Sequence, residues 1–128
     1  MTATDDGARP LTATDAADEW AGKLAAAWAA AGAPAHLLDG FTLWVLDGVP
    51  PGSHGWAVLN NDLRESIGTA DEESGAGLQR TVRALYTAAP SQSWGSADRC
   101  TRWRQHRGLR GLLAPDSQQG APQAPGSG

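Results

Sequence analysis

The sequence predicts an all-α protein: a compact bundle of about five short helices with a disordered tail at each end. Three observations support this. Apolar residues recur at spacings of three and four, the pattern of amphipathic helices. Glycine and proline separate these stretches at short intervals, and both ends of the chain lack the large apolar residues of a core. The predicted divisions are a disordered segment over residues 1–14, a single helical domain over 15–113 and a disordered Pro/Gly/Gln-rich tail over 114–128.

The first predicted helix runs from Asp15 to Ala31. Asp15 is its expected N-cap, because a carboxylate there accepts hydrogen bonds from unpaired backbone N–H groups. Gly32 and Pro34 end the helix. Its apolar stripe consists of Trp20, Leu24, Ala27, Trp28 and Ala31.

The second predicted element, over residues 35–47, fits either a short helix or a strand. Residues 41–46 include β-formers, but Leu37, Leu38, Phe41, Trp44 and Val45 follow the helical period better than a strict alternation. We therefore predict a helix, which a glycine at position 40 weakens by about 1 kcal/mol relative to alanine.

A stiff turn with two prolines, over residues 48–53, precedes the third predicted helix. Ser53 is its expected N-cap, and Gly68 stops it after Ile67. Three consecutive polar residues, at positions 60–62, interrupt its otherwise regular pattern. The predicted core face is Trp56, Leu59, Leu63 and Ile67.

Two further helices complete the prediction. The fourth begins near Asp71 and ends before Pro90. The fifth begins at Ser96 as N-cap and closes with Gly108 followed by Leu109, the pattern of a glycine C-cap. The fourth helix directs Leu78, Val82, Leu85, Tyr86 and Ala89 to the core, and the fifth directs Cys100 and Trp103 there.

The charge of the chain is unevenly distributed. The net charge is −4, but residues 1–73 hold twelve acids against three basic residues, whereas residues 74–128 hold seven arginines against two acids. Five of those arginines lie within the twelve residues 99–110. This stretch suggests an anionic partner, although internal pairing with the acidic half is the favoured interpretation.

The number of cysteines and the sequence at the ends of the chain limit the classes of protein that are expected. With Cys100 as the only cysteine, the chain forms no internal disulfide and no zinc site with paired cysteines. The beginning of the chain lacks the pattern of a signal peptide, and no stretch has the length of a membrane span. The expected location is the cytoplasm, with no cofactor and no membrane contact.

The reactive residue types are scattered. His36, His54 and His106 lie in different elements without the spacing of a helical metal site, so ordinary surface or helix-end roles are expected. Cys100 lies near two arginines, which can activate a thiol, but its place beside Trp103 favours core packing. For catalysis, the only other candidates are the carboxylates of residues 62 and 71.

Two helix starts, Gly52-Ser53 and Gly95-Ser96, are the best candidates for holding a ligand, since backbone N–H groups after a glycine bind anions. The favoured interpretation is that Asp62 caps one of these starts from within the protein. Trp94 precedes a cap and is the tryptophan expected at a binding surface. The complete candidate set is Gly52, Ser53, Asn61, Asp62, Trp94, Gly95, Ser96, Arg99 and Arg102.

Several short motifs occur in a characteristic order: Gly48-Val49-Pro50-Pro51-Gly52-Ser53, Ala57-Val58-Leu59-Asn60-Asn61-Asp62-Leu63, Ala70-Asp71, Leu85-Tyr86, Pro90 and Trp94-Gly95-Ser96. Over residues 36–104 the chain resembles a group of small uncharacterised proteins common in phages and prophages. His54-Gly55 replaces the aromatic-aliphatic pair of that pattern, and Ser74 replaces its asparagine. The resemblance implies a helical fold and a mobile-element setting, but no activity.

These observations favour a non-enzymatic accessory protein of the phage or prophage type. Its expected partner is a host protein or a small anionic, nucleotide-like ligand, and the chain itself leaves its oligomeric state open. A DNA-binding regulator that uses the arginine-rich last helix is the first alternative, because only that helix has the charge for nucleic acid. A small enzyme of unknown reaction is the second.

Overall fold

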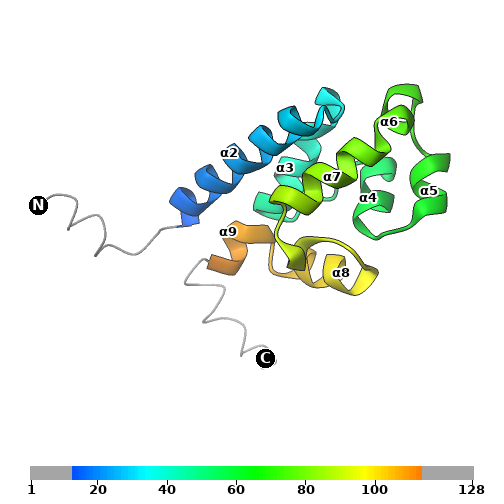
Figure 1. Cartoon of the computed structure of the whole chain (residues 1–128). Coiled ribbons are helices and arrows are strands. Elements are labelled where there is room, and N and C mark those ends of the chain that lie inside the picture. The colour runs from blue at the N-terminus through cyan, green and yellow to red at the C-terminus, as the bar shows by residue number, and fades with distance from the viewer. Residues whose placement is uncertain (1–12, 114–128) are drawn as a thin grey trace, which may run out of the picture.

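The computed structural model describes residues 13–113, and these residues form helices and turns without strands. Both predicted tails fall mainly outside this range. The all-α prediction is confirmed, but the described residues form eight α-helices rather than about five (Figure 1). They are α2 (Ala13–Ala31), α3 (Leu38–Asp47), α4 (Ser53–Leu59), α5 (Leu63–Gly68), α6 (Glu72–Ala76), α7 (Leu78–Ala88), α8 (Ala97–Gln105) and α9 (Gly108–Leu113), with 3-10 turns η1 (Ala35–Leu37) and η2 (Ser91–Ser93).

Helix α2 is the longest element and packs against α7, α3 and α9. It lies beside α7, which runs in the opposite direction (Figure 1). The helix begins at Ala13, so Asp15 lies in its first turn rather than at its N-cap. Leu24, Ala27 and Trp28 are buried, as its predicted stripe requires.

Buried indoles form the centre of the core. Trp28 packs on Phe41 with ring centroids 5.2 Å apart, and both Trp44 and Trp103 are almost completely buried. Each indole N–H donates to a backbone carbonyl: Trp28 to Pro34 at 2.8 Å, Trp44 to Ser93 at 2.8 Å and Trp103 to Trp44 at 2.9 Å. A buried polar group without a hydrogen-bond partner is costly, so these bonds are needed to satisfy the indole N–H groups. They also fix the orientation of the rings.

The predicted third helix is two helices, α4 and α5. Asn61 adopts a left-handed conformation with φ of 62°, and the Asp62 carboxylate then accepts a bond from the Glu65 N–H at 3.1 Å, which starts α5. The three polar residues 60–62 are therefore a chain reversal and a cap. The predicted core positions Leu63 and Ile67 are 66% and 60% exposed, so that part of the prediction is wrong.

The predicted fourth helix begins near Asp71 as expected, but it is also divided, at Gly77; Asp71 is the N-cap of its first part, α6. The second part, α7, buries Thr81, Ala84, Leu85 and Ala88. The prediction that Val82 and Tyr86 are core residues is wrong, because this stripe is rotated by about one residue from the expected one. Small residues on the buried face let α7 approach α2 closely, and the Thr81 hydroxyl is satisfied by the Gly77 carbonyl at 3.1 Å.

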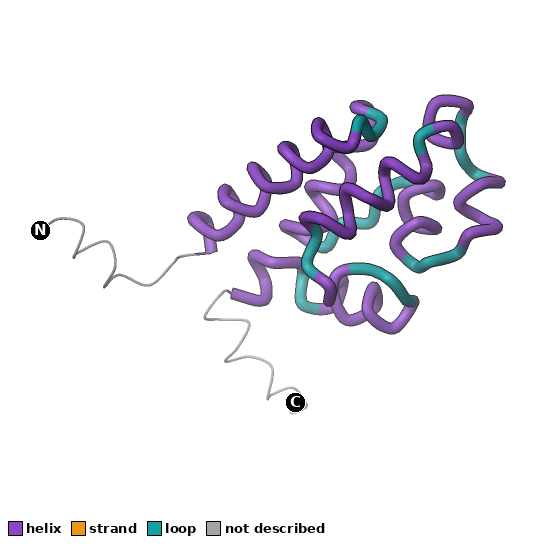
Figure 2. Tube along the Cα trace, viewed as in Figure 1, coloured by secondary structure: helices purple, strands orange, loops and turns teal. Residues whose placement is uncertain are grey.

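Ser96 is the N-cap of α8, and Cys100 and Trp103 are buried, all as predicted. The helix ends earlier than predicted, with His106 as its C-cap. Arg107 and Gly108 both have positive φ, and the chain continues into α9, which packs on α3. The expected glycine stop is thus the first residue of the next helix, and residues 106–107 link α8 to α9 (Figure 2).

Within residues 13–113, no helix combines the length and the apolar character that crossing a bilayer requires.

Candidate functional site

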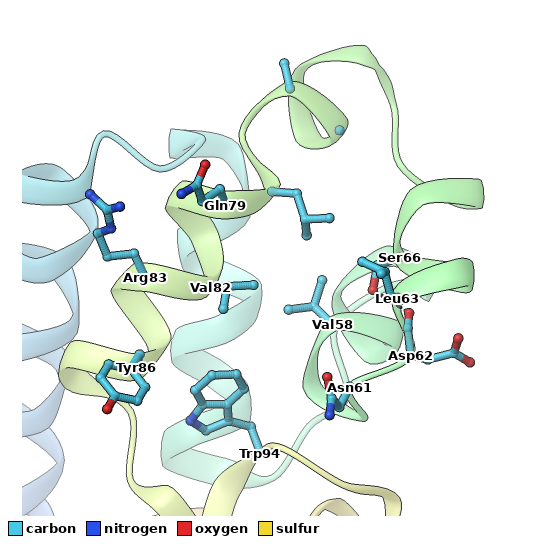
Figure 3. Close-up of a pocket in the computed structure, with 13 residues that line it drawn as sticks. Val58, Asn61, Asp62, Leu63, Ser66, Gln79, Val82, Arg83, Tyr86 and Trp94 are labelled. Atoms are coloured by element: carbon cyan, nitrogen blue, oxygen red, sulfur yellow. Dashed lines mark hydrogen bonds between the residues drawn. The ribbon is translucent and has the colours of Figure 1, made fainter.

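An apolar groove of about 700 Å³ lies between α5 and α7. Val58 of α4 lies in its middle, Leu63 and Val82 lie on opposite walls, and Trp94 lies at the end nearest η2 (Figure 3). Tyr86 stands at the α7 edge and is 82% exposed. Among the lining residues are Leu63, Val82 and Tyr86, which the helical pattern alone assigns to the core but which the described residues leave exposed.

A few polar groups border this apolar surface. Asn61 and Asp62 lie at the α5 edge, and Gln79 and Arg83 lie at the α7 edge (Figure 3). Asp62 caps its own helix α5, so the hypothesis that it caps the start at Gly52 or Gly95 is wrong. Of the predicted site residues, the structure brings Asn61, Asp62 and Trp94 together around the groove.

The other candidates lie in different places. Gly52 and Ser53 border a pocket of about 350 Å³ together with His36 and His54, while Ser53 and Asp62 also border a separate surface hollow near Ala97. Gly52 and Ser53 are therefore not parts of the groove.

The start of α8 is held by backbone contacts. The Gly95 N–H donates to the Leu59 carbonyl at 2.7 Å, and the Ser96 hydroxyl accepts from the Arg99 N–H at 3.2 Å. Trp94 is half-buried rather than fully exposed, since it packs against the core from its place in the groove. Arg99 and Arg102 border another pocket, on α8.

The pocket near Gly52 contains a cluster that resembles a hydrolase constellation. His36 Nε2 lies 3.1 Å from Ser74 Oγ, and its Nδ1 lies 3.6 Å from Glu73 Oε1. A serine, histidine and acid in this order are the residue types of a nucleophilic triad. However, Asp71 Oδ2 lies 3.4 Å from the same Nε2, so this nitrogen is not a free base toward Ser74, whose side chain is buried.

Asp71 has a structural role in this cluster. The Ser74 backbone N–H donates to its Oδ1 at 2.7 Å. This bond, the Ser74 hydroxyl and the nearby His36 hold the pKa of Asp71 below its usual range. The carboxylate is thus stabilised in its charged form as a helix cap, which is the opposite of what a general acid requires.

His54 is buried and links α4 to α5. Its Nδ1 lies 2.7 Å from the Ser66 carbonyl oxygen, to which it donates. Its Nε2 has no hydrogen-bond partner among the described residues. Across residues 13–113, no three His, Cys, Asp or Glu side chains converge as a metal site would require.

Cys100 packs in the core with no exposed surface. Burial raises the pKa of its thiol to about 11, so at pH 8 about one molecule in a thousand carries the reactive thiolate. We expect the folded protein to leave Ellman's reagent almost unreacted, and one thiol per chain to react after denaturation in guanidinium chloride. A folded-state reaction as fast as that of a free cysteine would contradict the burial of this thiol.

Comparison with known proteins gives no relative: no protein-family model matches the chain, and no curated protein or solved structure matches it either. The resemblance to small phage and prophage proteins therefore stays a prediction. The site must be interpreted from its own geometry.

Sequence reasoning missed the groove because it assigned Leu63, Val82 and Tyr86 to the core. One signal was present in the sequence. Asp62 followed by Glu65 has the spacing of a helix start with a capping acid, and recognising it would have ended the preceding helix before Asn61. A separate short helix after that break would have left the orientation of Leu63 open.

Proposed function

We propose that this protein is a non-enzymatic binding protein whose groove between α5 and α7 receives an amphipathic helix of a partner protein. The observation that carries this proposal is the exposed apolar surface formed by Leu63, Val82 and Tyr86 around the groove. Contiguous exposed apolar surface is costly in water and marks interaction sites in folded proteins.

The form of the groove favours a protein over a small molecule. A ligand that fills only the groove floor would leave Leu63 and Tyr86, at 66% and 82% exposure, largely in water. Ile67, on the same short helix as Leu63, extends the apolar surface beyond the groove at 60% exposure. A partner helix can place its apolar side chains in the groove. The sides of that helix then lie over Leu63, Ile67 and Tyr86 and cover all three.

The charged residues at the edges of the groove indicate which side chains the partner helix should present. Arg83 lies at the α7 edge and has no ion pair among the described residues. Asp62 lies at the opposite edge, with one of its carboxylate oxygens already used as a cap. We expect the partner helix to present an acidic residue toward Arg83 and an apolar stripe toward Val58.

Two features support a binding role over an enzymatic one. The His36 cluster has carboxylates at both ring nitrogens, and the cysteine is buried with a raised pKa. The resemblance to phage and prophage proteins is the reason to take a bacterial host protein as the partner. The DNA-binding alternative rests on α8, which contributes no residue to the groove.

Site-specific photo-crosslinking tests the proposal. A photoreactive phenylalanine analogue replaces Tyr86 in the full-length protein, which is expressed in a bacterial host and irradiated. We expect one discrete crosslinked protein whose attachment point, mapped by mass spectrometry, lies in an amphipathic helix. Adding Val82→Glu should weaken binding of that helix by about 30-fold, since central interface residues contribute about 2 kcal/mol or more.

The control is Leu43→Glu, which also introduces an acid at an exposed leucine, but on α3 and outside the groove. This variant should crosslink like the parent protein. If Val82→Glu and Leu43→Glu reduced crosslinking equally, the groove would not be a receptor for a helix. A crosslink whose attachment point lies in no helix would refute the proposal in the same way. A product of twice the 13.3 kDa chain mass would instead show self-association and overturn the choice of a heterologous partner.

A further inference from the structure

A second pocket, of about 340 Å³, lies beside α8 and η2 and is separate from the groove. None of the residues that line it is acidic, and two of them are arginines. They are Ser91, Gln92, Arg99, Arg102, His106 and Leu112.

The basic residues of this pocket share one side of α8. Arg99, Arg102 and His106 are separated by three and four positions, which places their side chains next to one another along the helix. Arg99 Nη1 donates to the carbonyls of Ser91 at 3.3 Å and Trp94 at 3.4 Å. These contacts hold the guanidinium against η2 while its remaining N–H groups stay available.

His106 is oriented by its own contacts. Its Nδ1 lies 3.1 Å from the Gly108 carbonyl oxygen, to which it donates, and its ring meets the buried Trp103 edge-on with centroids 4.9 Å apart. Since Nδ1 is occupied, Nε2 is the nitrogen left to meet a ligand.

Internal charge pairing does not account for these arginines. Among the arginines of residues 13–113, only Arg110 pairs with a carboxylate, that of Asp47 at 3.3 Å. Arg99 and Arg102 have no carboxylate within ion-pair distance in the described part of the chain. The expected pairing of the arginine-rich stretch with the acidic half is therefore found at Arg110, but not at Arg99 or Arg102 among the described residues.

We propose that this pocket binds the phosphate group of a small phosphorylated ligand of the nucleotide class, an activity beyond that of the groove. A guanidinium presents paired N–H donors that match phosphate oxygens. Two guanidinium groups, the Gln92 amide and the Ser91 hydroxyl supply donors on one side, and Leu112 supplies an apolar contact for the group that carries the phosphate. The volume suits a small ligand rather than a nucleic-acid duplex.

Calorimetric titration of the full-length protein with inorganic phosphate, with ATP and with a short single-stranded DNA tests this inference. Arg102→Gln should lower the affinity for the phosphate-bearing small ligands by about tenfold or more, the effect of losing one charge-assisted hydrogen bond. Arg104→Gln is the matched control, because it removes the same charge from the same helix outside the pocket. It should change the affinity by less than about twofold.

The outcomes are distinct. ATP binding tighter than phosphate supports a nucleotide, and equal binding supports a site for the phosphate group alone. Equal losses in the Arg102 and Arg104 variants, or no heat with either small probe at millimolar concentration, would overturn the proposal. DNA binding that is tighter than both and weakened equally by the two variants would replace it with a nucleic-acid surface. Gln92→Ala tests a second residue of the same pocket. Circular dichroism checks that each variant is folded.

Discussion

Replacement of Trp44 by alanine is expected to remove a large part of the stability of the fold. The side chain, on α3, is fully buried and its indole N–H bonds to η2, and truncating a buried tryptophan costs about 3–5 kcal/mol. The Ser93 carbonyl also loses the indole N–H that it accepts at 2.8 Å. A protein of this size is stable by about 5–15 kcal/mol, so this one change removes a large part of the total.

Trp44→Phe separates the two contributions of this indole. Phenylalanine keeps most of the apolar contact, including part of the edge-on packing with Trp56 at 5.4 Å, but leaves the Ser93 carbonyl with only the weak thiol donor of Cys100. We expect a smaller loss, about 1–3 kcal/mol. Chemical denaturation followed by circular dichroism measures both variants, and an alanine variant as stable as the parent would show that the core is not arranged around this residue.

Replacement of Gly108 by alanine is the second change with a large expected effect. Gly108 has φ of 72°, a conformation that residues with a Cβ rarely adopt. A Cβ there would lie 2.5 Å from the Gly48 nitrogen and 2.6 Å from the Asp47 nitrogen. Both are backbone atoms, so the clash is relieved only by moving α9 away from the end of α3, and we expect a loss of about 3 kcal/mol or more.

Gly22→Ala is the matched control for that substitution. Gly22 lies inside α2, and a Cβ added there would meet no neighbouring atom within 4 Å, so alanine should stabilise the helix by up to about 1 kcal/mol. The unfolding temperature should therefore rise in the Gly22→Ala variant and fall in the Gly108→Ala variant, although the chemical change is the same. A Gly108→Ala variant that melts with or above the parent protein would contradict the close approach of α9 to α3.

The η2 segment connects the two proposed sites. Trp94 lines the groove with its side chain, while its carbonyl accepts a hydrogen bond from Arg99 of the phosphate pocket. Ser93, next to it, accepts the bond from Trp44 at the centre of the core. The position of this short turn thus follows from core packing, and both sites depend on it.

The sequence by itself determined the helical class, the placement of the first, second and last predicted helices to within a few residues, the start of a helix near Asp71 and the cap at Ser96. These features depend on neighbours along the chain: the spacing of apolar residues, and side chains that reach a backbone N–H three residues away. The burial of Trp28, Trp44, Cys100 and Trp103 followed from the same local pattern.

The tertiary structure decided which stripe of α7 faces inward and where Leu63, Ile67 and Tyr86 lie. A helical period specifies that one face is apolar, but α7 carries apolar residues on more than one face. Close packing against α2 selected the small residues Ala84 and Ala88 together with Thr81, whose hydroxyl is satisfied locally. Leu85 is buried beside them, whereas Val82 and Tyr86 lie on the surface. The groove exists because the inward face of α7 depends on contacts between distant segments rather than on the sequence of either helix.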